Sequence, residues 1–521
     1  MAEVRGPLGE RGILVACASS SEAAAVAAAL RRGLPGAEEV VSGLDTVLVV
    51  DDRPDLRQAV VGLLDEDQPV VVPRRHEIPV VLDGPDLVEV LDRTGLDRSG
   101  LLAALSVALT VATVGFSPGF AYLEGIAGPL AGLARRATPR PRVPAGSLAV
   151  AAGMVAIYPQ ATPGGWWLLG RSPATLFDPT RTEPGLLRAG DEVRLVLDEG
   201  ARPAPAPPER RHLVPPEGAT PVLEVRAVPP GTMVVDGGRR GVAHLGVPAS
   251  GAADPERWAV ATRLVGGAPG ALEVTGSGLE LAVLAPTLVA GVDLALEVDG
   301  RIVPPGVPVA VAPGSLLRST AVGRGVRGYL GVAGGPLVPP VLGSMATDVL
   351  CGVGPGLAVG DVLGGGPLPA ASPVRGAVPE DPVPRLVRFV AGPHRDWCGG
   401  ALDGLVAEVS PTSNRVGLRV VPTAGPLDVV EGSVRSLPTV RGAIQLPPDG
   451  HPIILGPDRA TLGGYPLVGV VVAADHGVLG RLGPGEVVQL CEVGEDEARR
   501  AEVERRASSS GWVSGSAPTL G

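Results

Sequence analysis

The stretch that decides the fold runs from Gly442 to Gly469 and reads GAIQLPPDGHPIILGPDRATLGGYPLVG. Short β-branched runs alternate here with Pro, Gly and Asp turns, and helical periodicity is nearly absent. Strands this short, joined by turns this tight, hold polar side chains at loop tips without burying them. The stretch therefore predicts a β-rich unit whose loops carry the function. Its polar candidates are Gln445, Asp458, Arg459, Thr461 and Tyr465.

A weaker copy of this stretch, IYPQATPGGWWLLGR, runs from Ile157 to Arg171. In both copies a double glycine precedes an aromatic residue: Gly164-Gly165-Trp166 in one and Gly463-Gly464-Tyr465 in the other. A double glycine lets the backbone approach a neighbour or a ligand closely. We therefore predict that the chain repeats one β-rich unit.

Three similar endings support the repeat. The segments LLRAGDEVRLVL (186–197), VGDVL (359–363) and LGPGEVVQL (482–490) each read as a turn followed by a strand. Gly and Pro together supply 131 of 521 residues, while apolar residues remain at 45%. This combination indicates a globular, turn-rich β protein rather than disorder, because the Gly and Pro separate apolar runs.

The front of the chain has a different character. A strand is predicted at Ile13–Ala16, a helix at Ser20–Arg32, strands near Glu39–Val41 and Thr46–Val50, and a helix at Arg53–Leu64. This alternation suggests a compact α/β sandwich. The predicted fold class is mainly β, α+β overall. Its divisions are an α/β domain at 1–72, β units at 73–200, 223–370 and 371–495, a Pro-rich linker at 201–222, and a charged helix with a disordered tail at 496–521.

Composition excludes several functions. The chain contains no lysine, so all 44 basic residues are arginine. A Walker A loop, a Schiff base and a biotin carrier each need a lysine, and none of them can reside here. A net charge of −11 without a basic stripe argues against nucleic acid.

The uncharged run Ser99–Leu123 is broken by Pro118 and by glycines, so we predict a core helix leading into a strand rather than a membrane span. The four cysteines form no CxxC pair and read as free thiols of a cytoplasmic protein. The six histidines show no metal-ligand spacing.

Two short motifs match a pattern but lack its context. GFSPG (115–119) fits the G-x-S-x-G nucleophile elbow, yet Pro118 has no N–H for an oxyanion hole. We read Ser117 as a turn serine. GRGVRG (323–328) fits G-x-G-x-x-G, but a strand follows where a phosphate site needs a helix, so it reads as a turn.

Arginines beside turns are stronger candidates. Arg140 and Arg142 flank Pro141, and Arg415 lies in SNRVGLR; guanidinium groups suit carboxylate or phosphate oxygens. The alternative is that each pairs with a local acid. Turn aspartates are frequent because they bond the backbone, so the candidates among them are equally open to a structural role. These aspartates are Asp236, Asp254, Asp348 and Asp458.

Seven of the thirteen aromatic residues lie between Phe116 and Phe177, which indicates either a local core or a stacking site.

Longer motifs resemble a known family. GFSPGFAYLEG, PRPRVPAGSLAV and YPQATPGGWWLLGRSP resemble the B subunit of bacterial ATP-dependent 5-oxoprolinase, also known as a sporulation-kinase inhibitor or allophanate hydrolase subunit 1. From Val234 onward VVDGGRRG, GVPASGAAD, ALEVTGSG, YLGVAGG, VLGSMATD, SNRVGLR, GAIQLPPDGHPIIL and TLGGYP resemble the usual partner of that protein, the C subunit. The resemblance covers roughly residues 10 to 492 and suggests that both subunits are fused here.

The resemblance implies three cyclophilin-like β-barrel units, one in the B-like half and two in the C-like half. It also implies a separate, TIM-barrel-like A subunit, and it leaves room for a homo-oligomer. The activity expected is opening of 5-oxo-L-proline, a small-molecule amide, to L-glutamate with ATP. Phosphorylating the carbonyl oxygen activates the lactam. That step needs arginine and Mg²⁺ against phosphate charge and a carboxylate to orient water.

Site residues follow from the matching motifs. The hypothesis is that arginine-bearing loop tips of several barrels converge on one cleft. The catalytic candidates are Arg140, Arg142, Arg415, Asp458, Asp236 and Asp254, with Asp458 or Asp254 as a candidate Mg²⁺ ligand. The substrate-binding or nucleotide-binding candidates are Phe116, Gly119, Tyr122, Ser147, Gly164, Gly165, Trp166, Ser413, Asn414, Gln445, Thr461, Gly463, Gly464 and Tyr465.

The chain departs from the family at three polar positions. A histidine expected before GFxPGF is replaced within LLAALSVALTV, near residue 104; a glutamine is replaced by Val235 and an arginine by Met345. Two alternatives stay open. One is a biotin-dependent carboxyltransferase acting on urea or a similar small amide, with biotin supplied by another protein. The other is a non-catalytic regulator of a histidine kinase.

Overall fold

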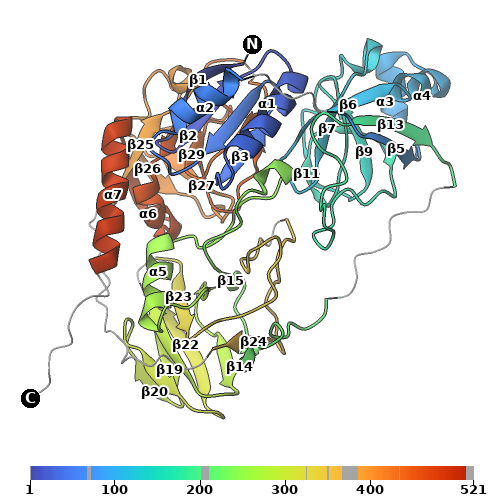
Figure 1. Cartoon of the computed structure of the whole chain (residues 1–521). Helices are drawn as coiled ribbons and strands as arrows, with labels where there is room; N and C mark the ends of the chain where they lie inside the picture. Colours follow the sequence, from blue (N-terminus) through green and yellow to red (C-terminus); the bar gives the residue numbers. More distant parts are fainter. Residues whose placement is uncertain are drawn as a thin grey trace, which may run out of the picture.

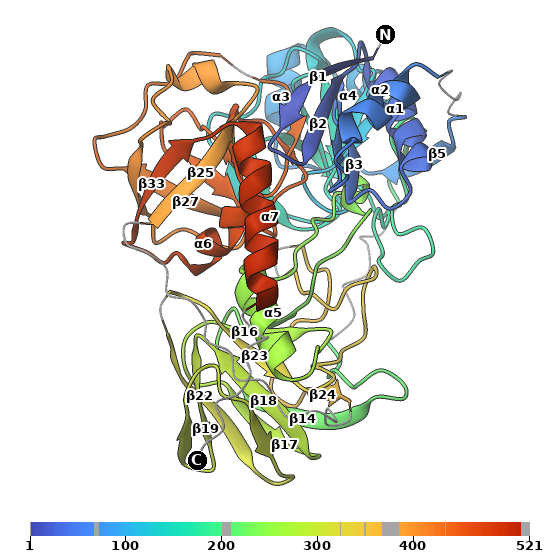
Figure 2. The ribbon, with the colours of Figure 1, turned by 60° about the vertical axis from the view of Figure 1, so that its left-hand side comes forward.

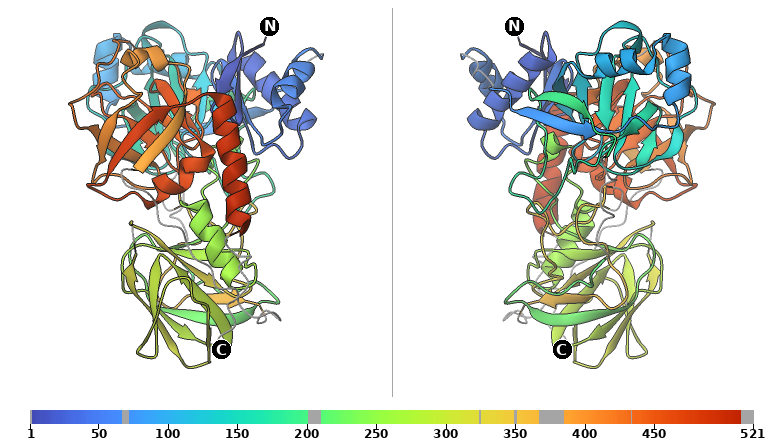
Figure 3. Two further views of the ribbon diagram at one scale, coloured as in Figure 1. Left: turned by 90° about the vertical axis from the view of Figure 1, so that its left-hand side faces the viewer. Right: turned by 90° about the vertical axis from the view of Figure 1, so that its right-hand side faces the viewer.

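A computed structural model describes residues 2–66, 72–200, 210–323, 325–348, 351–366, 385–432 and 434–511, and strands dominate it (Figure 1). The chain forms a small α/β unit and three β units. Figure 3 shows the middle unit, coloured green to yellow, below the other three in both side views.

The N-terminal unit is a sheet with helices on one face. Its elements are β1 (Glu3–Leu8), β2 (Gly12–Ala16), α1 (Ser20–Gly33), β3 (Glu39–Ser42), β4 (Thr46–Val50) and α2 (Leu56–Leu64). The strand order is β1-β2-β4-β3. α1 begins where Ser19 accepts a hydrogen bond from the N–H of Glu22, as helix N-caps do. The predicted strands and helices are present, but α2 begins at Leu56 rather than at Arg53, and the edge strand β1 was not predicted.

The two faces of this sheet bury different partners. Val15 and Val47 pack under the helices, whereas Leu14 and Leu48 belong to a second apolar cluster shared with Val470 of the C-terminal unit. The expected sandwich therefore has the C-terminal unit as its third layer, which joins the two ends of the chain.

The first β unit is a curled seven-stranded sheet. Its elements are β5 (Arg75–Val80), α3 (Leu87–Thr94), α4 (Arg98–Leu105), β6 (Ala108–Val114), β7 (Ala121–Glu124), η1 (Gly128–Leu130), β8 (Arg140–Val143), β9 (Ser147–Ala151), β10 (Met154–Ile157), β11 (Thr162–Gly164), β12 (Trp167–Arg171) and β13 (Glu192–Leu197). The strand order is β12-β9-β10-β7-β6-β13-β5, and a bridge between Val81 and Arg171 brings the two edges together. The predicted core helix leading into a strand is α4 followed by β6.

The C-terminal unit is a closed barrel. Its elements are β25 (Arg385–Ala391), η3 (Arg395–Cys398), β26 (Val406–Val409), β27 (Gly417–Pro422), β28 (Leu437–Pro438), β29 (Ala443–Gln445), β30 (Ile453–Leu455), β31 (Leu462–Gly463), β32 (Leu467–Val471), η4 (Ala473–Asp475), α6 (His476–Arg481) and β33 (Val487–Glu492). The strand order around the barrel is β25-β32-β29-β30-β27-β26-β33. When it is read as a ring starting at β32, it matches the order of the first β unit strand for strand, with β32 in the place of β12 and β25 in the place of β5.

The smaller pairings match as well. β11 pairs with β8, and β31 pairs with β28, so each double glycine lies at the end of the equivalent short strand. The repeat predicted from the two double-glycine stretches is confirmed.

The middle unit consists of two curled sheets packed face to face. Its elements are β14 (Thr220–Ala227), β15 (Met233–Val235), η2 (Ala243–Leu245), α5 (Pro255–Leu264), β16 (Ala271–Val274), β17 (Glu280–Val283), β18 (Thr287–Val292), β19 (Leu294–Val298), β20 (Arg301–Val303), β21 (Val309–Val311), β22 (Leu316–Val322), β23 (Gly328–Val332) and β24 (Val362–Gly365). The sheets are β20-β19-β22-β17-β14-β24 and β15-β16-β23-β18-β21. Leu281 and Leu296 of one sheet meet Leu272 and Leu330 of the other, and α5 covers the outer face of β18 and β23.

The last helix, α7 (Glu495–Gly511), extends from the barrel towards α5 of the middle unit (Figure 2). The charged helix predicted within 496–521 thus continues to Gly511, and what remains for the predicted tail is the segment after it. Residues 512–521 lie outside the described residues, as do 201–209 of the predicted linker. β14 begins at Thr220, inside that predicted linker.

Each of the three predicted endings contains a strand: β13, β24 and β33. Among the described residues, none of the helices combines the length and the apolar composition that a membrane span requires. The four cysteines are free thiols, as predicted.

Candidate functional site

A buried cluster of charges joins the middle unit to the C-terminal barrel. Arg415 lies in the loop between β26 and β27, and its Nε and Nη2 donate to both carboxylate oxygens of Asp458 at 2.7 and 3.0 Å. Its Nη1 donates to Oε1 of Glu273 at 2.7 Å, and Nη2 also donates to the carbonyl of Gly251 at 2.7 Å. One guanidinium thus holds two carboxylates from two units, in the bidentate geometry that arginine favours.

Glu273, in β16, is the most enclosed member of the cluster. Its Oε2 accepts from the Tyr329 hydroxyl at 3.0 Å and from the N–H of Ala253 at 2.8 Å. Arg327 lies 3.2 Å from its Oε1. Burial by itself would raise the pKa of Glu273, but Arg415 and Arg327 offset this, and the pKa lies below its ordinary value. The carboxylate is therefore ionised in the protein interior.

Asp254 lies next to this cluster and begins α5. Its Oδ1 accepts from the N–H groups of Glu256 and Arg257 at 3.0 and 3.1 Å, as a helix N-cap does. It also pairs with the buried Arg481 of α6. Burial, which is stronger than the effect of Arg481, raises the pKa of Asp254. These contacts give Asp254 a structural role in docking α5 on α6.

A cavity of about 180 Å³ opens beside the cluster. Three arginines, three polar loop residues (Thr275, Ser413 and Asn414) and apolar side chains surround it. They include Arg327, Arg415, Arg441, Ser413, Asn414, Val326, Leu418, Leu479 and Leu482. We call it the small cavity. Its size suits a compact molecule rather than the drug-sized or larger ligands that fill pockets of roughly 300–1,000 Å³.

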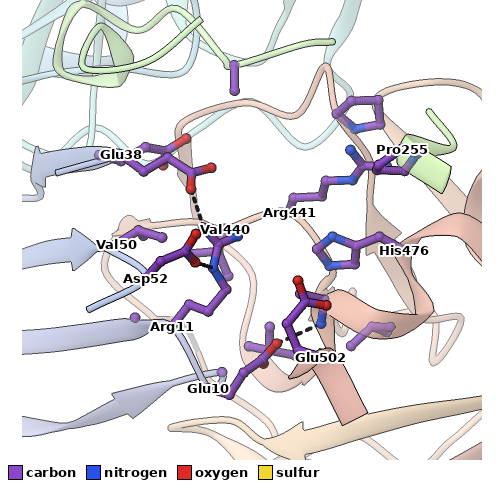
Figure 4. Close-up of a pocket in the computed structure, with 18 of the residues that line it drawn as sticks. Glu10, Arg11, Glu38, Val50, Asp52, Pro255, Val440, Arg441, His476 and Glu502 are labelled. Carbon is purple, nitrogen blue, oxygen red and sulfur yellow. Dashed lines mark hydrogen bonds and ion pairs between the residues drawn. The ribbon is translucent and has the colours of Figure 1, made fainter. Parts of the chain in front are cut away.

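A second cavity, of about 240 Å³, lies where the N-terminal sheet, the barrel, the middle unit and α7 meet (Figure 4). We call it the junction cavity. Its wall contains charges of both signs: Glu10, Arg11, Glu38, Glu39, Asp52, Arg240, Glu256, Arg441, Arg459, Glu502, Arg505 and Arg506. Arg441 lines both cavities.

Many of the charges around the junction cavity are paired. Arg11 bonds Glu38 and Asp52, and Arg459 donates to both oxygens of the buried Glu39. His476 also lines this cavity, and burial followed by the charge of Arg441 lowers its pKa well below the ordinary value. His476 is therefore neutral at pH 7.

The structure does not bring Arg140, Arg142, Arg415 and Asp458 to one arginine-lined cleft: Arg415 lines the small cavity, and the other three line neither of the two cavities. Arg415 and Asp458 are in direct contact, whereas Arg140 lies in the first β unit, where it donates to Asp86 at 2.6 Å. Arg142 is exposed on the same strand. Neither the small cavity nor the junction cavity includes Arg140 or Arg142 in its wall. The reason is local, because Asp86 is buried and also accepts from Arg136 at 3.2 Å.

The aromatic candidates form a core. Phe120 makes edge-to-face contacts with Phe116, Tyr122, Tyr158 and Trp166, with ring centroids 5.0 to 6.1 Å apart. All but Phe116 are buried, and Phe116 packs against the same cluster. Of the two interpretations from the sequence, the structure supports the core.

The nearby backbone candidates are positioned by close packing. Gly119 has φ of 74°, and its N–H donates to the carbonyl of Leu245 in the middle unit at 2.8 Å. A side chain on Gly164 would begin 2.3 Å from the Tyr158 hydroxyl, whereas Gly165 has 3.6 Å of clearance. Ser147, in β9, is buried. These residues shape the loops and are not gathered around either cavity.

The GFSPG turn of the first β unit contacts the loop that leads into β31 of the C-terminal barrel. A side chain on Gly115, the first residue of GFSPG, would begin 2.3 Å from Leu462. The contact brings Thr461, buried, against the first β unit. Gln445 is buried beside Gly463, whose β-carbon would lie 2.1 Å from the Gln445 amide. Gly464 and Tyr465 are exposed at the loop tip.

The remaining candidates are held by turns. Asp236 accepts from the Ser344 hydroxyl at 2.6 Å and from the N–H of Met345 at 2.7 Å, which fixes the 344–345 loop. Ser413 and Asn414 line the small cavity, and Asn414 accepts from the N–H of Val416 at 2.9 Å. GFSPG is a turn, closed by a hydrogen bond from the N–H of Phe120 to the carbonyl of Ser117 at 3.0 Å.

Sequence reasoning missed Glu273, Arg327, Tyr329 and Arg441. Glu273 and Tyr329 lie inside ALEVTGSG and YLGVAGG, and Arg441 directly precedes the opening stretch. For Glu273 the available signal in the sequence was a lone charge in an apolar strand. Its partner could not be identified, because Arg415 is 142 residues from Glu273 in the chain.

The three departures from the family pattern lie in apolar packing. Val235 and Met345 are buried in the cores of the middle unit, and Ala104 packs against the core of the first β unit. Among the described residues, no group of three or more His, Cys, Asp or Glu side chains could hold a metal ion.

Comparison with known proteins places these units in one family. Residues 5–187 match the model "Carboxyltransferase domain, subdomain C and D", and residues 245–492 match "Carboxyltransferase domain, subdomain A and B". The first half is 39% identical over 173 residues to the B subunit of 5-oxoprolinase from Escherichia coli O157:H7, covering 31% of this chain and 79% of that protein. The second half is 30% identical over 298 residues to the C subunit of 5-oxoprolinase from Escherichia coli K12, covering 53% of this chain and 92% of that protein.

Two further likenesses span other lengths. Urea amidolyase of Saccharomyces cerevisiae is 29% identical over 297 residues, which covers 50% of this chain and 16% of that protein. The crystal structure of TTHA0988 superposes with a TM-score of 0.83 at 35% identity, covering 93% of this chain and all of the other. The chain therefore belongs to the carboxyltransferase-domain family of the 5-oxoprolinase B and C subunits, and it unites a B-like and a C-like half in one polypeptide.

Proposed function

We propose that the chain is the fused B and C component of a cytoplasmic, ATP-dependent 5-oxoprolinase. Together with a separate A subunit, it would convert 5-oxo-L-proline, ATP and water to L-glutamate, ADP and phosphate. The observation that carries this proposal is that one chain spans most of both subunits, 79% of one and 92% of the other. The buried contacts between the N-terminal sheet and the C-terminal barrel support action as one body.

The chemistry requires a site that handles a small, charged molecule. A lactam is a poor electrophile. Phosphorylation of its carbonyl oxygen would let one water add to the carbonyl carbon and the ring C–N bond break, and a second water would then release the phosphate. Developing negative charge is stabilised best by preorganised donors in a site that excludes water. The small cavity offers guanidinium groups fixed by buried carboxylates and surrounded by apolar side chains. We assign it to the lactam, with Arg415 positioned by Asp458 and Glu273 in its wall.

The nucleotide does not fit either cavity of this chain by itself. Volumes of about 180 and 240 Å³ are below the roughly 300–1,000 Å³ of typical pockets for larger ligands. Because Mg²⁺ is often held mainly by substrate phosphates and water, it would enter with ATP. We therefore propose that the separate A subunit would complete the ATP site.

A second candidate is a biotin-dependent carboxyltransferase acting on urea or a similar amide. The description of both matching family models favours it. Because the chain has no lysine, biotin would have to arrive on a separate carrier protein.

The test is to follow ADP release by the purified chain with 5-oxo-L-proline and Mg·ATP, with and without the A subunit. We expect release that depends on both 5-oxoproline and the A subunit. A requirement for urea and a biotinylated carrier would support the carboxyltransferase instead. Tight binding of a histidine kinase without turnover would support the regulatory alternative.

A further inference from the structure

Arg441 differs from the other two arginines that line the small cavity. Arg415 and Arg327 both pair with Glu273, at 2.7 and 3.2 Å. Within the part of the chain that the structure describes, no carboxylate lies within 4.0 Å of the Arg441 guanidinium. Arg441 instead donates from Nη1 to the carbonyl of Ala252 at 3.1 Å and from Nη2 to that of Ala253. Among the described residues it therefore makes no direct ion pair, although the charges of Asp254 and Glu273 lie near enough to act on it.

The two carbonyl contacts fix Arg441 without neutralising it. A guanidinium has five N–H donors, so donors remain for a further acceptor. Arg441 is half-buried, and a charge partly removed from water gains from an anionic partner. Burial, and after it the charge of Arg415, lowers the pKa of Arg441 to about 10, so the group is still a cation at pH 7. A bound anion would supply the missing partner.

The shape of the small cavity restricts which anion can bind. Leu418, Leu479 and Leu482 supply apolar wall, while Ser413 and Asn414 offer polar groups. A volume of about 180 Å³ admits a compact, partly apolar molecule. A guanidinium binds both carboxylates and phosphates with bidentate geometry, and the apolar wall favours the carboxylate, which carries the smaller charge. These features match a small ring that carries one carboxylate.

We propose that Arg441 binds the carboxylate of the small-molecule substrate in the small cavity. This assignment rests on the proposed function, under which the substrate is 5-oxo-L-proline and its carboxylate is distant from the lactam bond that opens. Arg441 therefore orients the substrate and selects acids over neutral amides, while the bond-breaking chemistry takes place at the other end of the molecule.

The experiment measures binding without ATP and without any partner protein. The full chain is titrated by calorimetry with 5-oxo-L-proline and with its neutral carboxamide, and acetate serves as a minimal carboxylate probe. We expect the wild type to bind the acid at least about tenfold more tightly than the carboxamide, as a charge-assisted contact of about 1.4 kcal/mol or more would give. Arg441→Met should abolish this preference, and Arg441→Lys should restore part of it.

Arg395→Met is the matched control. Arg395 lies on the same barrel but pairs with Glu492 on the surface, so the preference should be unchanged. Circular dichroism and thermal unfolding confirm that each variant folds, and Arg441→Lys keeps the test usable if Arg441→Met does not. Equal binding of acid and carboxamide by the wild type, or a preference that survives Arg441→Met, would overturn the proposal. If Arg441-dependent acetate binding is found but 5-oxoproline-dependent ADP release is not, the carboxylate site stands and the proposed activity fails.

Discussion

At the scale of single residues, the molecule depends on charges buried in pairs. Glu273 is completely buried and ionised, and it is acceptable there because Arg415, Arg327, Tyr329 and the N–H of Ala253 surround it. Breaking such a cluster by removing one charge is costly because the other charges stay behind without compensation.

Glu273→Gln should therefore lower the free energy of unfolding by about 3–5 kcal/mol, since Arg415 and Arg327 lose their shared counter-charge while the shape is kept. Urea denaturation measures the loss. Glu492→Gln is the control, because Glu492 pairs with Arg395 at 3.0 Å on the surface, where a pair contributes about 0–1 kcal/mol. Equal losses in the two variants would show that the buried cluster has no special weight.

At the scale of elements, the repeated double glycine is explained by clearance. The first glycine of each pair leaves no room for a β-carbon: 2.3 Å to the Tyr158 hydroxyl at Gly164 and 2.1 Å to the Gln445 amide at Gly463. At the second glycine of each pair, an added β-carbon would lie 3.6 Å from its nearest neighbouring atom, which is an ordinary van der Waals contact. The short strands β11 and β31 can approach their barrels because these glycines lack a side chain.

Gly164→Ala should destabilise the protein by about 1–3 kcal/mol, because the buried Tyr158 ring cannot move away without repacking. Gly165→Ala should change stability by no more than about 0.5 kcal/mol, as is usual for substitutions that meet no obstacle. Thermal and urea unfolding of the two variants give the comparison. If both substitutions have the same effect, clearance does not explain the motif.

At the scale of the whole molecule, the two halves are joined by contacts distant in sequence. Leu14 and Leu48 of the N-terminal sheet pack on Val470 of the barrel, and the buried Arg459 donates to Glu39. The N–H of Gly119, in the first β unit, donates to the carbonyl of Leu245 in the middle unit. These contacts make the two halves one body rather than two domains joined by a linker.

A protease site placed between residues 201 and 209 should yield two pieces that remain together in size-exclusion chromatography. The buried contacts between the halves, unlike the linker, survive the cut. Arg459→Met should weaken the association of the cut halves, because it leaves Glu39 buried without its partner. Separation of the wild-type pieces after cleavage would contradict the claim that buried contacts hold the two halves together.

The stability of the protein should also depend on pH through His244. This residue lies in η2, next to Leu245, which accepts the hydrogen bond from Gly119. Burial, and after it the charge of Arg31, lowers the pKa of His244 to about 4. Below pH 6.5 the unfolded chain takes up a proton that the folded chain takes up only near pH 4. The free energy of unfolding should therefore fall between pH 6.5 and 4, by up to about 3 kcal/mol from this residue.

Urea denaturation at a series of pH values tests this expectation. His244→Gln should flatten the decline relative to the wild type, since the variant lacks the proton uptake of that side chain. Parallel pH profiles for the two proteins would rule out a contribution from His244.

The sequence predicted local features well and long-range partners poorly. Turn-rich strands, the α/β start and the repeat followed from Gly, Pro and apolar spacing, which act over a few residues. The pairing of Arg415 with Asp458 and Glu273 depends on chain topology, as does the capture of Arg140 by Asp86. Arg441 was not identified because its significance lies in lacking a carboxylate partner, which no motif can express.

The most direct measurement of the central claim is product formation by the purified chain mixed with the A subunit. L-Glutamate and ADP are quantified in the complete mixture and in mixtures that lack 5-oxo-L-proline, Mg·ATP or one of the two proteins. We predict that both products appear together, in equal amounts, only when every component is present. ADP release that does not depend on 5-oxoproline, or no glutamate from the complete mixture, would contradict the assignment as a 5-oxoprolinase component.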